Sequence, residues 1–545
     1  MGLSKKKIAV LIASFFALTF FTYGSSIKNE FVNYDDDTLI YLNPAVQEFS
    51  PESIAWVFTH LDPELYIPVT FLSYQLDHII GGLNPSVFHT TSIILHTLNA
   101  LFVVWLIFLL SKKSWLALFC GLLFAVHPLH TETVMWASAR KEVLSTFFFL
   151  SALIAYIYHQ DIKNNKWYFL SLGLFLFGIL SKVSIVILPI ILLLIDFKKN
   201  RKINLQSFIT KIPYFVISII FGVVALLGKQ SVLSSSSYLD SVLMAFKSTA
   251  FYLQKLFIPT NLSVIYPYNE QISITSPDFL LPIITIIALI VLVILSVKKT
   301  KEVLFGSLLF FIALIPSFTN YARAGDIFYA SDHYAYLPSI GILYIVGIAF
   351  MFLLNRYRKV ALSSLFVILI TFSILSSSQA KIWENNSTLF GNVIYQFNDS
   401  YLAHNKIGLD FYDENNLSKA INSFNSSIEI KPNASAYYNL GVAYIALQQY
   451  SSALDAITKS VELDPSKMMA QYNLGYLYSN IGQNRKAIER FLIVVENNPK
   501  DIDALKNLAV LNIKIGDTEK AKIYINNILE IDPENGDVKI LLQKI

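Results

Sequence analysis

Charged residues are scarce in this sequence. They make up 15% of its 545 residues, whereas hydrophobic residues make up 54%. Soluble domains carry about 25% charged residues, so this composition excludes an ordinary soluble protein and places most of the chain in lipid. The net charge of +4 is too small to indicate nucleic-acid binding. We therefore expect membrane lipid, and no nucleic acid, among the partners.

Cysteine is almost absent, because Cys120 is the single one and it lies inside an apolar run. This excludes a disulfide framework and gives no sign of the redox compartment. The shortage of charge is also uneven along the chain. The long apolar runs lie within residues 1–378, and residues 400–545 are ordinary in polarity. The composition therefore predicts a membrane part followed by a water-exposed part.

Uncharged runs predict eleven membrane spans, several of them shorter than the roughly 20 residues that a straight helix needs. Basic clusters separate these spans in pairs, so the positive-inside rule places every cluster in the cytoplasm. The N-terminus is then cytoplasmic and the chain after the last span is extracytoplasmic. The expected spans are 8–27, 86–110, 114–126, 143–158, 167–181, 183–195, 213–228, 279–297, 303–319, 336–354 and 360–378.

A repeat with a period near 34 occupies the polar C-terminal part. Small residues recur at Gly408, Gly441, Gly475 and Ala509, and a proline closes each repeat. Small residues let paired helices pack closely, and the period is typical of a tetratricopeptide solenoid. Such arrays bind extended peptides or partner proteins. The expected domains are a polytopic membrane domain (1–385) with its first outer loop (28–85), four repeats (400–535) and a C-terminal cap (536–545).

Three consecutive carboxylates, Asp35, Asp36 and Asp37, follow the first span and fall on the expected outer face. Holding like charges so close together costs free energy. A solvated acidic turn is the simplest interpretation. The alternatives are a general base that acts on an acceptor hydroxyl and a ligand for a divalent metal, and a single acidic cluster does not decide between them.

Other polar side chains also gather near the expected outer face. Histidines in apolar helices usually satisfy packing hydrogen bonds, but four of them at one face indicate a cavity lining. No spacing among them matches a zinc site. Cations on the outer side are candidates for binding a lipid phosphate. The cavity candidates are His89, His96, His127, His130, Glu132 and Asp332, and the cationic candidates are Arg140, Lys141 and Lys182.

An ordered set of short motifs resembles the family of transmembrane and tetratricopeptide-repeat proteins, in particular its microbial branch. The animal members are O-mannosyltransferases of the C-type glycosyltransferase superfamily. The resemblance spans nearly the whole chain. The motifs include Asn33-Tyr34-Asp35-Asp36, Leu83-Asn84-Pro85, the segment from Phe124 to Glu132, Ser181-Lys182, Asn261-Leu262-Ser263 and Asp332-His333-Tyr334.

This resemblance implies an all-α, C-type glycosyltransferase fold and a polyprenyl-phosphate sugar as donor. It implies that Asp35 is the catalytic base and that Asp36 supports it. It places Arg140, Lys141 and Lys182 at the lipid phosphate. His333 stands where the family usually has arginine, so it joins the phosphate-binding candidates as a departure from the pattern.

The leading interpretation is an extracytoplasmic glycosyltransferase that moves a sugar such as mannose from a polyprenyl phosphate to Ser or Thr of a protein recruited by the repeats. The first alternative is a non-enzymatic membrane scaffold that carries the repeats. The second is a transporter of lipid-linked sugars, which requires polar residues along the spans toward the inner leaflet. The polar residues cluster at one face instead, which disfavours transport.

Overall fold

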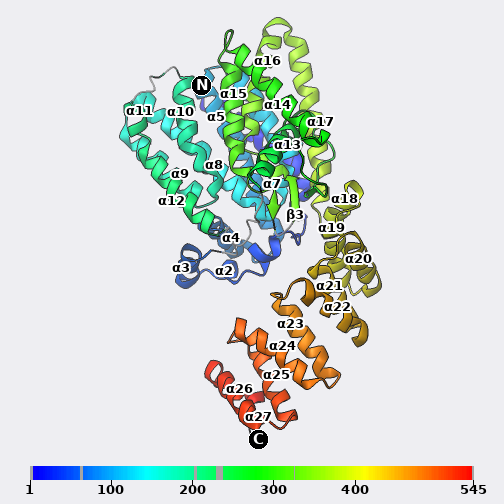
Figure 1. Ribbon diagram of the computed structural model, residues 1–545. Coiled ribbons are helices and arrows are strands. Elements are labelled where there is room, and N and C mark those ends of the chain that lie inside the picture. The colour runs from blue at the N-terminus through cyan, green and yellow to red at the C-terminus, as the bar shows by residue number, and fades with distance from the viewer. Residues whose placement is uncertain are drawn as a thin grey trace. The chain divides into compact units, whose positions relative to one another are not determined.

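The computed structural model describes residues 4–61, 65–199, 201, 205–228, 237–323 and 326–542. Within these residues the fold is almost entirely helical, which confirms the all-α class predicted from the sequence. The chain divides into two compact units, Met1–Gln396 and Phe397–Ile545. Each unit has hydrophobic clusters of its own. Helices and strands carry the labels of Figure 1.

Unit 1 contains the long apolar helices. Its helices are α1 (Lys5–Tyr23), α2 (Pro44–Gln47), α3 (Pro51–Thr59), α4 (Pro68–Gly81), α5 (Pro85–Ser111), α6 (Ser114–Val126), α7 (Thr131–Met135), α8 (Arg140–Ile162), α9 (Asn165–Ile179), α10 (Leu188–Lys198), α11 (Leu205–Ile209), α12 (Ile212–Gly228), α13 (Tyr238–Phe257), α14 (Pro277–Ser296), α15 (Glu302–Leu314), α16 (Ser339–Arg356), α17 (Arg358–Ile382) and α18 (Asn386–Gln396).

Local chemistry sets the ends of these helices, as α5 illustrates. The side chain of Asn84 accepts a hydrogen bond from the backbone N–H of Ser86 at 3.1 Å, and Pro85 occupies the first turn. Proline is favoured there because its missing N–H has no partner within the helix. At the other end, Lys112 adopts a left-handed conformation with φ of 58°, which closes the helix. The apolar run between these signals therefore forms one continuous helix.

Each of the eleven expected spans coincides with a helical segment. Among the described residues, six helices are long and apolar enough to cross a membrane, or seven if one bent pair counts as a single span. The bent pair joins Ser114–Val126 to Pro128–Met135 with an angle of 56°. Ile212–Gly228 and Glu302–Ser317 are apolar but shorter. The count of eleven therefore stays a prediction.

The core of unit 1 lies between α5, α6, α8, α9 and α16. Close approach of α15 and α16 depends on two glycines. A Cβ on Gly306 would meet the backbone oxygen of Gly341 at 2.6 Å, and a Cβ on Gly341 would meet the oxygen of Gly306 at 2.4 Å. Only glycine avoids this clash, so the two helices pack backbone to backbone.

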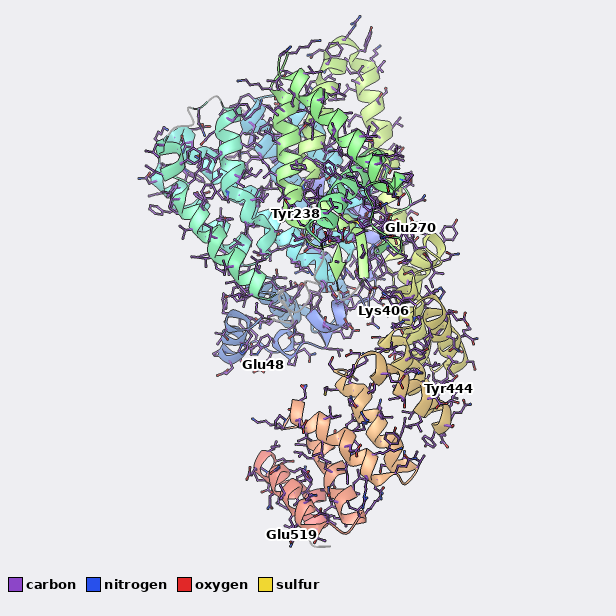
Figure 2. All side chains as sticks on the ribbon, viewed as in Figure 1. Glu48, Tyr238, Glu270, Lys406, Tyr444 and Glu519 are labelled. Atoms are coloured by element: carbon purple, nitrogen blue, oxygen red, sulfur yellow. The ribbon has the colours of Figure 1, made fainter. Side chains whose placement is uncertain are left out.

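A small sheet and short helices lie at one end of the helix assembly. Strands β1 (Tyr266–Pro267), β3 (Asp326–Ala330) and β2 (Ala322–Arg323) are antiparallel, in the spatial order β1-β3-β2. Figure 1 shows β3 and α7 at the same end of the unit as α2, α3 and α4. Glu48 marks the segment between α2 and α3 in Figure 2. Polar loop segments that are far apart in sequence meet at this end.

Unit 2 is a row of helix pairs in which each helix packs on the next. Lys406, Tyr444 and Glu519 mark three of the pairs in Figure 2. Its helices are α19 (Tyr401–Asp413), α20 (Leu417–Ile430), α21 (Ala434–Ala446), α22 (Tyr450–Leu463), α23 (Met468–Asn480), α24 (Asn484–Asn497), α25 (Ile502–Lys514), α26 (Thr518–Ile531) and α27 (Gly536–Leu542).

The recurring small residues explain this pairing. A Cβ on Gly441 would meet the side chain of Ile457 at 2.5 Å, and a Cβ on Gly408 would meet Phe424 at 2.5 Å. Each glycine on the first helix of a pair therefore receives a large apolar side chain from the second helix. In the last pair the small residue is Ala509, which shares a hydrophobic cluster with Ile525.

Candidate functional site

The acidic run after α1 has an unusual backbone. Asp35 adopts φ of 73°, a left-handed conformation that is uncommon for residues other than glycine, although asparagine and aspartate adopt it more often than most. The indole Nε1 of Trp136 donates a hydrogen bond to the backbone oxygen of Tyr34 at 2.7 Å, and the two rings lie 5.2 Å apart. The loop is thus fixed against the segment before α8, and the Asp35 side chain remains half-buried.

Asp36 has a different environment from its neighbour. It is 1% exposed, and Oδ1 accepts hydrogen bonds from the backbone N–H and the hydroxyl of Ser138 at 2.9 and 2.5 Å. Oδ2 accepts one from the backbone N–H of Val32 at 3.0 Å. Burial raises the pKa of Asp36 to about 7, against the lowering effect of these hydrogen bonds. Asp36 therefore ties the acidic loop to the start of α8.

A cavity of about 210 Å³ opens beside Asp35. Asp35 lines it, but Asp36 and Asp37 do not. Asp37 begins a short π-helical turn, Asp37–Tyr41, and no residue of this turn lines the cavity. The structure thus separates the three carboxylates, and only the first contributes to the cavity wall.

Two of the predicted cations line the same cavity. Lys141 is 7% exposed and lies over the ring of Trp136, with Nζ 5.1 Å from the ring centroid. Lys182 forms an ion pair with Glu142 and lies over the ring of Tyr334 at 5.4 Å. These lysines come from α8 and from the connection between α9 and α10, so the fold brings separate segments to one wall.

His333 also lines the cavity, and two buried acids lie behind it. Its Nδ1 is hydrogen-bonded to Oε1 of Glu132. Asp332 accepts a hydrogen bond from the hydroxyl of Tyr266 at 2.9 Å. Burial, followed by the nearby charge of Glu132, raises the pKa of Asp332 well above its usual range. Glu132 and Asp332 therefore support the cavity wall rather than form its surface.

Arg140 has a different environment from Lys141 and Lys182. Its side chain is fully buried, and Nη2 donates to Oδ2 of Asp77 at 2.8 Å and to the backbone oxygen of Phe88 at 2.6 Å. Its Nε donates to the hydroxyl of Ser92 at 3.0 Å. Arg140 is absent from the cavity lining. The guanidinium points into a polar site between α4, α5 and α8, and the phosphate contact expected for it stays a prediction.

The four histidines expected at a cavity do not line this one. His96 bonds to the hydroxyl of Tyr336 at 2.7 Å, and His130 bonds to the hydroxyl of Ser339 at 3.0 Å. His127 bonds to the backbone oxygen of Leu256 at 3.0 Å. His89 is 1% exposed. These histidines are buried in the helix packing and contribute nothing to the wall of this cavity, so a cavity role for them stays a prediction.

Trp136 and Ser138, which the structure places at the site, were not among the residues predicted from the sequence. Trp136 contacts both Tyr34 and Lys141, and Ser138 binds Asp36. Their only sequence signal is their position inside the segment from Glu132 to Leu144, which also resembles the family. Across the described part of the chain, no group of three or more His, Cys, Asp and Glu side chains is placed to hold a metal ion.

The wall of the cavity thus combines one half-buried carboxylate, two lysines, one imidazole and several aromatic rings. A carboxylate can accept a proton from a hydroxyl, and lysines can stabilise a phosphate. Aromatic rings give an apolar surface with polar edges. This set fits a group-transfer reaction with an anionic leaving group.

Comparison with curated proteins gives relatives with one shared description. Human protein O-mannosyl-transferase TMTC2 is 34% identical over 184 residues, which are 31% of this chain and 21% of that protein. Human TMTC3 is 24% identical over 449 residues, or 73% of this chain and 48% of that protein. The chain is thus similar to the TMTC proteins. This agrees with the resemblance predicted from the sequence motifs.

A third relative is protein O-mannosyl-transferase F38B6.6 of Caenorhabditis elegans, which is 25% identical to this chain over 448 residues. That match covers 76% of this chain and 62% of the relative. Across these three relatives the match spans 21% to 62% of their own length.

Family models match unit 2. Residues 408–448 match a TPR repeat, and residues 434–467 and 472–536 match tetratricopeptide repeats. Among solved structures, MamA is 24% identical. The match covers 27% of this chain and 88% of the MamA chain, with a TM-score of 0.26. A second solved structure is YrrB, described as a TPR protein with an unusual peptide-binding site. It is 21% identical, and the match covers 36% of this chain and 98% of YrrB, with a TM-score of 0.27.

Proposed function

We propose that this chain is a membrane glycosyltransferase that transfers a sugar from a polyprenyl-phosphate carrier to Ser or Thr of an extracytoplasmic protein. The observation that carries the proposal is the shared cavity of Asp35, Lys141, Lys182 and His333. The names of the curated relatives support protein O-mannosylation and favour mannose as the sugar.

Asp35 is the general base in this proposal. The acceptor hydroxyl oxygen forms a bond to the anomeric carbon, and its proton passes to the Asp35 carboxylate. The bond between that carbon and the phosphate oxygen breaks, and its electron pair leaves with the lipid phosphate. A single displacement of this kind inverts the anomeric carbon. Holding the two reactants in one cavity removes much of the entropic barrier.

Lys141 and Lys182 stabilise the phosphate as it leaves. Their ammonium groups lie beside aromatic rings and, for Lys182, beside a carboxylate, so both are held in place before the donor binds. Preorganised charges of this kind stabilise a transition state without reorganisation at the moment of reaction. Asp36 holds Asp35 and the start of α8, which carries Lys141, in register through its bonds to Ser138.

Unit 2 recruits the protein acceptor in this proposal. We expect removal of residues 400–545 to retain transfer to a short Ser/Thr peptide and to lower transfer to the whole acceptor protein by about tenfold or more, since tethering raises effective concentration. Radiolabelled sugar transfer to the two acceptors measures the difference. Gly441→Leu, which clashes with Ile457, tests the same point in the full chain, with exposed Ser452→Ala as its control. Equal modification of the whole acceptor by the truncated enzyme would contradict recruitment.

The N-terminus is cytoplasmic and unit 2 extracytoplasmic in this proposal, as the distribution of basic clusters predicts. We expect a reporter that is active only outside the cytoplasm to be active when fused after Ile545. A matched fusion after Lys199, in an expected cytoplasmic loop, should be inactive. Reporter activity at both positions measures the topology, and the reverse pattern would place the cavity on the wrong face for this reaction.

A further inference from the structure

A buried carboxyl group lies directly behind the imidazole that lines the cavity. Oε1 of Glu132 contacts Nδ1 of His333, and the hydroxyl of Ser331 lies 3.0 Å from that oxygen and 2.9 Å from that nitrogen. Glu132 is 3% exposed and His333 is 8% exposed. One nitrogen of the ring is therefore held by a side chain that is itself almost inaccessible to solvent.

The other ring nitrogen of His333 lies near the ion pair of Glu142 and Lys182. Nε2 lies 3.8 Å from Oε1 of Glu142, the carboxylate that pairs with Lys182. The ring packs between Trp136 and Tyr334, with centroid distances of 5.5 and 4.2 Å. Aromatic packing fixes the plane of the ring, and Nε2 lies where an anion already approaches it.

The number of protons on this pair decides what Nε2 can do. Burial, and then the charges of Lys182 and Lys141, hold the pKa of His333 well below its usual range, so the ring is uncharged at neutral pH. A neutral imidazole carries one N–H. Burial raises the pKa of Glu132 above its usual range, against the lowering effect of hydrogen bonds from Ser331 and from the backbone of His333 and Asp332, and so favours the protonated, uncharged carboxyl group. A protonated Glu132 donates to Nδ1, and the hydrogen of the ring then lies on Nε2.

We propose that Glu132 sets the tautomer of His333 so that its Nε2–H donates a hydrogen bond to the phosphate of the lipid carrier. The proposal rests on the proposed function and adds a neutral, directional donor to the charges of Lys141 and Lys182. Glu132 acts through His333 and is a positioning residue. The pair transfers no proton in this step, so the balance of the displacement reaction is unchanged.

The same arrangement gives a pH dependence. At alkaline pH the pair loses a proton, Nδ1–H then donates to the Glu132 carboxylate, and Nε2 becomes an acceptor that repels phosphate oxygens. Binding of a lipid phosphate should therefore weaken as the pH rises. The other charged or titratable groups that face this pair are Asp35, Lys141, Lys182, Glu142, Tyr252, Tyr266, Asp332 and Tyr334.

Binding of a fluorescent polyprenyl monophosphate to the purified full chain tests the proposal. We expect His333→Leu to weaken binding by about tenfold to a hundredfold, the usual effect of losing a hydrogen bond to a charged group. His60→Leu, at an exposed histidine outside the cavity, should bind as the wild type does. Glu132→Gln should bind at neutral pH, because its amide N–H also donates to Nδ1, and should lose the alkaline weakening because an amide does not titrate.

Binding by His333→Leu equal to that of His60→Leu, or absent binding by the wild type, would overturn the proposal. So would an unchanged alkaline weakening in Glu132→Gln, and this arm decides the matter if His333→Leu does not fold. A wild-type chain that binds the lipid phosphate through His333 but transfers no sugar would contradict the proposed function alone. Asp35-dependent transfer without any effect of His333→Leu would contradict this inference alone.

Discussion

Asp35→Asn lowers sugar transfer by about 10²- to 10⁴-fold, the usual contribution of a general base. The amide cannot accept the proton of the acceptor hydroxyl, so the nucleophile is not activated. Asparagine is the replacement of choice because it tolerates the left-handed conformation, with φ of 73°, that Asp35 adopts. The measurement is kcat for transfer from polyprenyl-phosphate mannose to a Ser/Thr peptide by the purified protein.

Asp37→Asn is the matched control for this change. Asp37 carries the same charge two residues further along but does not line the cavity, so its variant should transfer sugar at close to the wild-type rate. Unchanged transfer by Asp35→Asn would contradict the assignment of the base. Loss of transfer in Asp37→Asn alone would show that the catalytic position in the acidic run is shifted from the first carboxylate.

Arg140→Met lowers the free energy of unfolding by about 3–5 kcal/mol, the usual cost of removing one partner from a buried ion pair. The change leaves the carboxylate of Asp77, whose side chain is 3% exposed, without its cation. Adding Asp77→Leu to Arg140→Met should recover part of the loss, because no buried charge then remains. Denaturant unfolding in detergent, followed by circular dichroism, measures these differences.

Lys166→Met provides the comparison for Arg140, since Lys166 is exposed near the start of α9 and should change stability by less than about 0.5 kcal/mol. An Arg140→Met protein that is as stable as the wild type but no longer binds a polyprenyl phosphate would contradict the structural role. It would restore the phosphate contact that the sequence predicted for this arginine.

Two adjacent cations in α8 have different environments that the sequence does not predict. Arg140 and Lys141 are consecutive cations on the outer side of the predicted membrane part, and the sequence treats them alike. Successive residues on a helix point about 100° apart, so one faces the buried Asp77 and the other faces the cavity. The sequence holds no signal for that choice, because Asp77 lies 63 residues away in the chain.

The sequence by itself determined the helical class, the apolar helices and the repeats. Each of these depends on local composition or on a period, such as the small residues that let Gly441 and its equivalents receive a side chain from the paired helix. It also singled out Asp35, Lys182 and His333 as candidates.

Only the tertiary structure decided which candidates share a cavity. It gathered Asp35, Lys141, Lys182 and His333 and placed Asp36 and Arg140 in buried contacts. The physical reason is that burial and partner choice depend on contacts between segments far apart in the chain, such as Asp36 with Ser138. Asp36 accepts three hydrogen bonds inside the protein, whereas Asp35 faces a cavity. The sequence alone does not distinguish these two carboxylates.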